Sequence, residues 1–168
     1  TTQWKRDLSW RVVEKVYPDD SVDSYNFDPA SGWLTEMTRA KDQSTGNPTE
    51  TYSYFLAGQL AGTDYTDTNT ADVTYAYHPI HGRLQAATQA AVNKVTSFTY
   101  HPADGSTLGA DQLHTVDGPW VDDKLEYLYD ALGRITTTNL LDDADNALST
   151  QSLTFDALER IQTSTSPL

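Results

Sequence analysis

Apolar and polar residues alternate in short segments along the chain, and the most regular feature is a pair of aromatic residues separated by one residue. Alternate positions of an extended chain lie on the same face of a sheet, whereas a helix needs spacings of three or four. Six segments follow this pattern, with Leu153 in place of the first aromatic of the last pair. The pairs are Tyr25/Phe27, Tyr52/Tyr54, Tyr75/Tyr77, Phe98/Tyr100, Tyr127/Tyr129 and Leu153/Phe155. The pattern therefore predicts strands, each with one aromatic face.

The second aromatic of each pair recurs at intervals of 23 to 29 residues. This interval suits two strands and two turns, so each interval is predicted to be one β-hairpin. We predict a single repeat region over residues 1–168, cut from a longer protein. Its repeats are placed near residues 22–50, 51–72, 73–95, 96–124, 125–150 and 151–168.

A turn is predicted directly after each aromatic pair. In Asp130-Ala131-Leu132-Gly133 the aspartate can accept hydrogen bonds from the backbone ahead of it, and glycine can take the left-handed conformation that closes the turn. Three turns have a longer form with proline and begin at Asp28, His78 and His101. The predicted turn glycines are Gly32, Gly58, Gly82, Gly105 and Gly133. In the last repeat Glu159 stands at the glycine position, and we expect it to be strained there.

Arginine follows the turn in three repeats, as Arg83, Arg134 and Arg160. Its planar guanidinium donates several hydrogen bonds in fixed directions. We therefore expect these arginines to bind the turn carboxylates, such as Asp130 and Asp156, or a neighbouring tyrosine hydroxyl.

A second class of turns lies between the repeats. These turns fall at Thr45–Pro48, Asp64–Asp72, Gln89–Lys94, Asp117–Pro119 and Asp142–Asn146. Turns at both ends of each strand, with no helical crossover, predict an all-β fold: an antiparallel meander of about a dozen strands. We expect twist to curve this sheet and its two edges to be open. No segment has the pattern of a convincing amphipathic helix; Arg83 to Val95, rich in Ala and Gln, is the best candidate for a short one.

The segment Tyr127 to Ile135, which reads Tyr-x-Tyr-Asp-x-x-Gly-Arg-Ile, resembles the YD repeat of Rhs proteins. Tyr75 to Leu84 and Leu153 to Ile161 are near copies of it. The same repeat occurs in toxin-complex B and C subunits, in cell-wall-associated repeat proteins and in teneurins. The resemblance covers residues 22–165, with six matches in register.

This resemblance implies a strip of β-hairpins that spirals into a hollow shell around a toxin domain or another polypeptide. It implies a secreted or cell-surface bacterial protein, with flanking repeats and an enclosed polypeptide as partners. The chain is then a structural wall segment and not an enzyme. Bacterial members often carry a self-cleaving Asp-Pro-x-Gly-Leu segment. The segment Asp28 to Leu34 is only superficially similar to it, and we interpret it as an ordinary turn.

The formal net charge of −13 argues against binding to nucleic acid, whose phosphates are met by Lys and Arg. It also argues against an anionic membrane surface. The chain has no cysteine, so disulfides and thiolate metal sites are excluded. No apolar run approaches the length of a membrane span, and we find no signal peptide within this chain.

Three groups of residues could suggest a metal site, but none of the patterns is specific. His78, His81 and His101 fall at or beside turns, where His78 and His101 take the position that aspartate fills elsewhere. The run Asp142 to Asn146 looks like half of a calcium loop, yet it lacks the central glycine and the later bidentate glutamate. Asp64, Asp67, Asn69 and Asp72 form a similar loose set. We read all of them as turn residues and predict no metal and no cofactor.

The alternative function is a surface module that binds polysaccharide by stacking sugars on exposed aromatic rings. Trp33 and Trp120 are the candidates, because both sit beside turns; Trp4 and Trp10 complete the set of tryptophans. The two functions predict different surfaces: a wall needs packed aromatics, whereas a sugar site needs a groove with at least two exposed rings.

Overall fold

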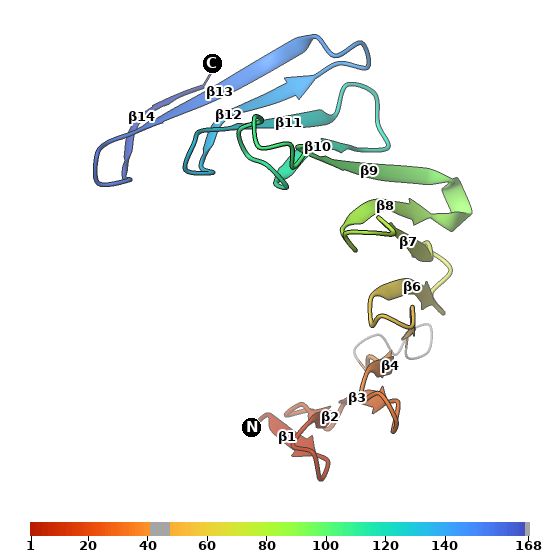
Figure 1. The fold of residues 1–168 in the computed structure, drawn as a ribbon. Helices are drawn as coiled ribbons and strands as arrows, with labels where there is room; N and C mark the ends of the chain where they lie inside the picture. The colour runs from red at the N-terminus through yellow and green to blue at the C-terminus, as the bar shows by residue number, and fades with distance from the viewer. Residues whose placement is uncertain (41–47, 167–168) are drawn as a thin grey trace. The chain divides into compact units, whose positions relative to one another are not determined.

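The computed structural model describes residues 1–40 and 48–166, and fourteen strands lie in these ranges (Figure 1). The strands are β1 (Gln3–Arg6), β2 (Val12–Val16), β3 (Val22–Phe27), β4 (Leu34–Thr38), β5 (Thr49–Tyr54), β6 (Leu60–Tyr65), β7 (Val73–Tyr77), β8 (Leu84–Gln89), β9 (Lys94–Tyr100), β10 (Leu113–Asp117), β11 (Lys124–Tyr129), β12 (Ile135–Leu141), β13 (Ala147–Phe155) and β14 (Ile161–Thr165). The expected all-β class is confirmed, with two strands more than the dozen predicted.

Each strand is hydrogen-bonded to the next strand along the chain, so the order in the sheet is the order in the sequence. The pairings are antiparallel, as in β11 with β12, where Tyr127 lies opposite Thr138 and Leu125 opposite Leu140. This is the predicted meander of hairpins. We number the hairpins 1 to 7, hairpin 1 being β1–β2 and hairpin 7 being β13–β14.

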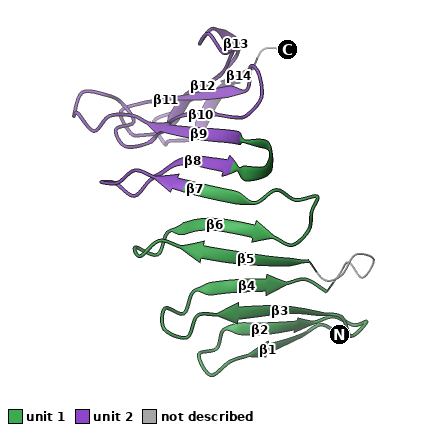
Figure 2. Ribbon diagram, turned by 90° about the vertical axis from the view of Figure 1, so that its right-hand side faces the viewer, with its two compact units in different colours: residues 1–75, 89–93 green, residues 76–88, 94–168 purple. Residues whose placement is uncertain are grey.

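The chain divides into two compact units, shown in different colours in Figure 2. Unit 1 holds residues 1–75 and 89–93, and unit 2 holds residues 76–88 and 94–168. Hairpins 1 to 3 belong to unit 1 and hairpins 5 to 7 to unit 2, whereas hairpin 4 is divided between the two. Within the described residues, no helix is long and apolar enough to cross a membrane. The far-end turn predicted at Thr45–Pro48 lies, apart from Pro48, outside the described residues.

The segment from Arg83 to Val95, the best candidate for a short helix, is mostly extended. Residues Leu84–Gln89 form β8, and only Ala90–Val92 make a single 3₁₀ turn before β9 begins at Lys94. Asn93 closes that turn with a φ of 48°, a left-handed conformation that asparagine tolerates better than most residues. Sheet pairing on both sides has overridden the weak helical preference of Ala and Gln.

A seventh hairpin precedes the six predicted ones. Its tip is Asp7-Leu8-Ser9-Trp10-Arg11, in which Asp7 N donates to Arg11 O over 3.0 Å and Trp10 N to Asp7 O over 3.0 Å. Arg6 occupies the position of the second aromatic, so a search for aromatic pairs misses this hairpin. The spacing of aspartate and arginine, which equals that of Asp130 and Arg134, is the signal that marks it.

The short tips share one hydrogen-bond pattern, seen clearly in hairpin 6. Asp130 N donates to Arg134 O over 2.9 Å, and Gly133 N donates to Asp130 O over 3.0 Å. The carboxylate of Asp130 accepts from Leu132 N, Arg134 N and Arg134 Nε. Gly133 has a φ of 76°, as the left-handed turn position requires. In hairpin 7, Asp156 and Arg160 repeat these bonds while Glu159 holds the same position at a φ of 65°.

The sheet has almost no interior. Among the described residues no large side chain is fully buried, and Ala40 and Leu141 are the apolar residues that count as buried. The aromatic pairs are half-buried throughout, and the residue between the two members of each pair is exposed. Each hairpin therefore takes its stability mainly from its neighbours, as in solenoid proteins.

We predict that Glu159→Gly stabilises the protein by about 1 kcal/mol, because a residue with a Cβ is strained at this φ. Urea unfolding measures the change. Glu159→Ala is the matched control: it removes the exposed carboxylate but keeps the Cβ, so it should bring no comparable gain. Equal effects of the two substitutions would show that the gain comes from charge and not from the backbone.

Candidate functional site

The contacts between consecutive hairpins are the most regular chemical feature of the chain, and we call each of them a junction. A junction joins the residue that follows the tip of one hairpin to the second aromatic of the next. In unit 1, the Arg11 guanidinium lies 4.6 Å from the centre of the Phe27 ring. At the next junction Trp33 takes the place of arginine, and its ring centre lies 5.0 Å from that of Tyr54.

Unit 2 repeats the arrangement with the same geometry. Arg83 lies 4.8 Å from the centre of the Tyr100 ring, and Arg134 lies 4.2 Å from that of Phe155. A guanidinium over an aromatic face is attracted by the ring quadrupole, by about 0.5–1 kcal/mol where the site is exposed. As predicted, both arginines bind a turn carboxylate: Arg134 binds Asp130, and Arg83 binds Asp111. Both also contact the ring of the following hairpin.

A tyrosine hydroxyl adds a directional bond at the junctions. The Tyr54 hydroxyl donates to the Leu34 carbonyl over 2.8 Å, and the Tyr100 hydroxyl donates to the Leu84 carbonyl over 3.0 Å. The Tyr129 hydroxyl reaches the Leu113 carbonyl over 2.8 Å. In each case the acceptor is the second residue after a hairpin tip. The ring contact and the hydroxyl bond together set the register of one hairpin on the next.

The junction between hairpins 5 and 6 departs from this pattern. No arginine faces Tyr129; instead a Cβ added at Gly109 would clash with the Tyr129 ring, so only glycine fits there. His101 packs against the edge of the same ring, with 5.6 Å between ring centres. A loop from His101 to Gln112 carries Gly109 to this position, and it is the longest tip in the described part of the chain.

This loop corrects two details of the predicted repeat. Gly105 is left-handed, with a φ of 75°, but it is not the last turn position: Asp111, with a φ of 66°, donates its N–H to His101 O. His101 does not cap its turn as aspartate does, because its side chain is buried and its Nε2 lies 3.0 Å from Tyr127 O. His78, by contrast, does cap its turn, since its Nδ1 accepts from Ile80 N and His81 N.

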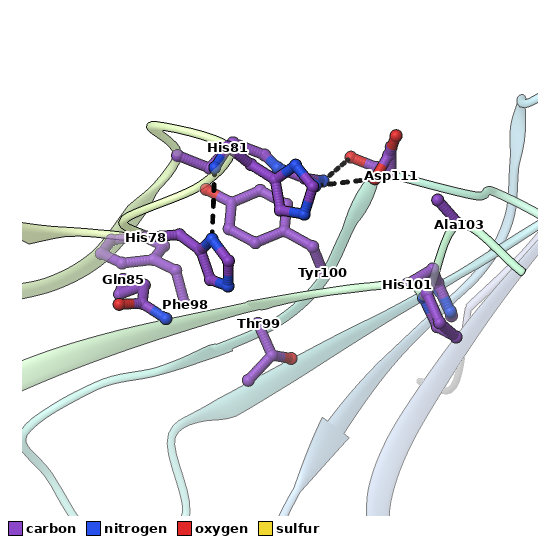
Figure 3. A pocket seen from close by; sticks show the side chains of 11 residues that line it. His78, His81, Gln85, Phe98, Thr99, Tyr100, His101, Ala103 and Asp111 are labelled. Atoms are coloured by element: carbon purple, nitrogen blue, oxygen red, sulfur yellow. Dashed lines mark hydrogen bonds and ion pairs between the residues drawn. The ribbon is translucent and has the colours of Figure 1, made fainter.

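A groove of about 310 Å³ lies in unit 2 beside this loop (Figure 3). The His78 and His81 rings stack at 4.7 Å on one side, and His101 lies toward the other end. Between them, Arg83 pairs with Asp111 at 2.7 Å and lies over the Tyr100 ring. The charged groups of the groove therefore neutralise each other, and the groove is the packed junction of hairpins 4 and 5.

Several of the predicted turn aspartates accept hydrogen bonds from donors within the protein. Asp142 accepts from Ala144 N and Asn146 N, while Lys124 Nζ pairs with Asp145 at 2.5 Å. Asp67 accepts from Asn69 N and the Thr70 hydroxyl. Over residues 1–40 and 48–166, no three His, Asp or Glu side chains are placed to hold a metal ion.

These hydrogen bonds change the acidity of the turn carboxyls. Backbone N–H groups of Ser106 and Thr107 hold the pKa of Asp104 at about 2, against an ordinary value of 3.8. The backbone and side chain of Arg134 lower the pKa of Asp130, and those of Arg160 lower the pKa of Asp156. In each case the turn stabilises the charged carboxylate.

The two tryptophans proposed as sugar platforms lie in different surroundings. Trp33 is half-buried between Tyr54 and Gly58, where an added Cβ would lie 3.1 Å from Trp33 Cζ2. Both sides of its ring are thus engaged, and it serves the junction. Trp120 is 64% exposed, and Lys94 Nζ lies over its ring.

No protein-family model and no curated protein matches this sequence. Solved structures do match. The crystal structure of TcdB2-TccC3-Cdc42 aligns with a TM-score of 0.71 at 18% identity, over 98% of this chain and 9% of that chain. TcdB2-TccC3 without its hypervariable C-terminal region aligns at 0.69 and 17% identity, over 98% and 9%.

The Tc holotoxin pore of Photorhabdus luminescens, with a TccC3 variant, aligns at 0.68 and 14% identity, over 99% of this chain and 9% of that chain. This chain has the fold of these toxin-complex proteins. The resemblance read from the Tyr-x-Tyr-Asp repeats is confirmed at the level of the fold. The chain spans 9% of the length of the chains that it matches.

Sequence reasoning missed three parts of the junctions. These are Arg11 in the first hairpin, Gly109 in the long loop, and the carbonyls of Leu34, Leu84 and Leu113 as tyrosine partners. Only Arg11 leaves a trace in the sequence, through its spacing from Asp7. The other contacts join residues of different hairpins, and no local pattern reports them.

We predict that Tyr129→Phe destabilises the protein by about 1 kcal/mol, because it removes the bond to the Leu113 carbonyl and leaves that acceptor unpaired. The free energy of unfolding in urea measures the loss. Tyr127→Phe, on the same strand, is the matched control, since the Tyr127 hydroxyl has no hydrogen bond within the described part of the chain. A loss of equal size in both variants would contradict a role for the junction bond.

We also predict that Asp104 titrates with a pKa of about 2, as a carboxyl-detected NMR titration can measure. Because the folded pKa lies below the unfolded value, the stabilisation is complete above pH about 4 and is lost as the pH falls toward 2. Asp104→Asn should therefore flatten the pH dependence of unfolding in this window. A midpoint near 3.8 would show that the turn does not hold the carboxylate.

Proposed function

We propose that this chain is a wall segment of a shell built from YD-type hairpins, which encloses or displays a toxin or another effector polypeptide. One observation carries the proposal: a one-layer run of hairpins, joined by repeated junctions, matches over 98% of its length a segment that makes up 9% of the chain in TcdB2-TccC3-Cdc42. Such a strip has no core of its own and gains stability as hairpins are added.

The chemistry of the strip supports a structural role. Its arginines, turn aspartates and tyrosine hydroxyls are engaged with one another at tips and junctions. These contacts hold neighbouring hairpins together, as a structural role requires. We accordingly propose a protein that is not an enzyme and needs no cofactor.

The proposed setting is a secreted or cell-surface assembly of a bacterium, with flanking repeats and an enclosed polypeptide as partners. The likeness to parts of a Tc holotoxin supports this setting. The polysaccharide-binding alternative has less support, because Trp33 is packed between Tyr54 and Gly58 and leaves Trp120 as the exposed member of the pair.

Limited proteolysis of the complete gene product tests the proposal. We expect the polypeptide outside the repeats to resist a protease that digests the same polypeptide expressed alone, because the wall excludes the protease. Adding urea until the repeats unfold should abolish this protection and serves as the control. Digestion of the linked and the separate polypeptide at equal rates would contradict enclosure.

A further inference from the structure

The tip of hairpin 4 is closed by a histidine, whereas hairpins 1, 2, 6 and 7 use aspartate at this position. His78 Nδ1 accepts from Ile80 N and from His81 N, each over 3.2 Å (Figure 3). Two backbone bonds of 2.8 Å complete the tip, from His78 N to Arg83 O and from Gly82 N to His78 O. An imidazole nitrogen therefore does the work of a carboxylate here.

The tip of hairpin 2 is the same structure with aspartate in that place. Asp28 N donates to Trp33 O and Gly32 N donates to Asp28 O, both over 2.8 Å. Asp28 Oδ1 accepts from Ala30 N over 3.1 Å and from Ser31 N over 2.6 Å. The two tips thus share their backbone bonds and differ in the acceptor that caps them.

The two acceptors respond differently to acid. In a neutral imidazole one nitrogen carries the proton and the other accepts, so the bonds to His78 Nδ1 place the proton on Nε2. A second proton must then bind at Nδ1, where it removes the lone pair and faces two N–H donors. A carboxylate stays an acceptor far into acid, and bonds from the backbone and side chain of Ser31 lower the pKa of Asp28 further.

The surroundings of His78 also oppose a positive charge. The His81 ring stacks on it with 4.7 Å between ring centres, and Arg83 lies in the same tip. Among the described residues that line the groove, the carboxylate is that of Asp111, and the Arg83 guanidinium binds it at 2.7 Å. The other ionisable side chains of this lining, both on hairpin 5, are Tyr100 and His101.

We propose that the tip of hairpin 4 is a pH-sensitive switch, closed at neutral pH and opened when a proton binds His78 Nδ1. The closed tip excludes this proton and the open tip accepts it, so a falling pH favours the open tip. Because histidine changes its charge between about pH 5 and 8, the switch works in that range. Tips capped by aspartate, such as that of hairpin 2, stay closed.

Opening of this tip also loosens the junction between hairpins 4 and 5, and both partners lie in unit 2. The carbonyl of Arg83 is held by His78 N, and its guanidinium lies over the Tyr100 ring and pairs with Asp111. When the tip opens, Arg83 loses the backbone bond that fixes its direction. Acid therefore acts at one junction of the strip, and this inference does not depend on what the strip encloses.

Amide exchange of the full chain at about pH 7.5 and about pH 5 tests the switch. The measured quantity is the protection of each amide relative to an unfolded chain at the same pH. We expect the protection of the His78 and Gly82 amides to fall by about tenfold or more at the lower pH. The amides of Asp28 and Gly32 in hairpin 2 are the internal control and should keep their protection. Equal losses in both tips, or no loss in hairpin 4, would overturn the proposal.

Reciprocal variants separate the cap from other effects of acid. His78→Asp should abolish the loss of protection in hairpin 4, and Asp28→His should create one in hairpin 2. His81→Ala removes the stacked ring but keeps the cap, so the loss should persist. If His81→Ala abolished it, or if Asp28→His created none, the cap would not be the switch. A nitrogen-15 spectrum that places the proton of neutral His78 on Nδ1 would also overturn the proposal.

Discussion

The contact of an arginine or tryptophan with the ring of the following hairpin is the interaction on which the rest of the structure depends. A single-layer sheet buries little apolar surface, and here no large side chain in the described residues is fully buried. Hairpins in isolation are marginal in water, so each must be held by its neighbours. The junctions hold the hairpins together. Arg134 packs over the Phe155 ring, and Trp33 packs against the Tyr54 ring, so these contacts take the place of a second layer.

The tips prepare the junctions. A turn aspartate such as Asp130 binds the backbone and the guanidinium of Arg134, which fixes the direction of that side chain. The same arginine then meets the ring of the next hairpin with little freedom left to lose on packing. One aspartate thus closes the turn and positions the contact.

The loop from His101 to Gln112 shows how far the pattern can vary. Here a glycine and an imidazole replace arginine at the Tyr129 ring, yet the Tyr129 hydroxyl keeps its bond to the Leu113 carbonyl. The Tyr129 ring thus keeps the position that the ring has at the other junctions, although the residues that contact it differ. A sheet with such tolerance can carry longer loops at its tips without losing the register of its strands.

The local parts of this structure could be read from the sequence. Alternation placed the aromatic pairs on strands, and the Asp-x-x-Gly-Arg spacing located the tips, because those bonds join residues at most four apart. The same locality revealed the strained Glu159. The first hairpin was missed because Arg6 replaces an aromatic. The best helix candidate, near Ala90, is almost entirely strand, because pairing on both sides of the segment outweighs its weak helical propensity. Only the tertiary structure decided the junctions, where Tyr54 meets Leu34 and Arg83 meets Tyr100 across 16 to 20 residues. Those contacts depend on strand register, which the whole sheet sets.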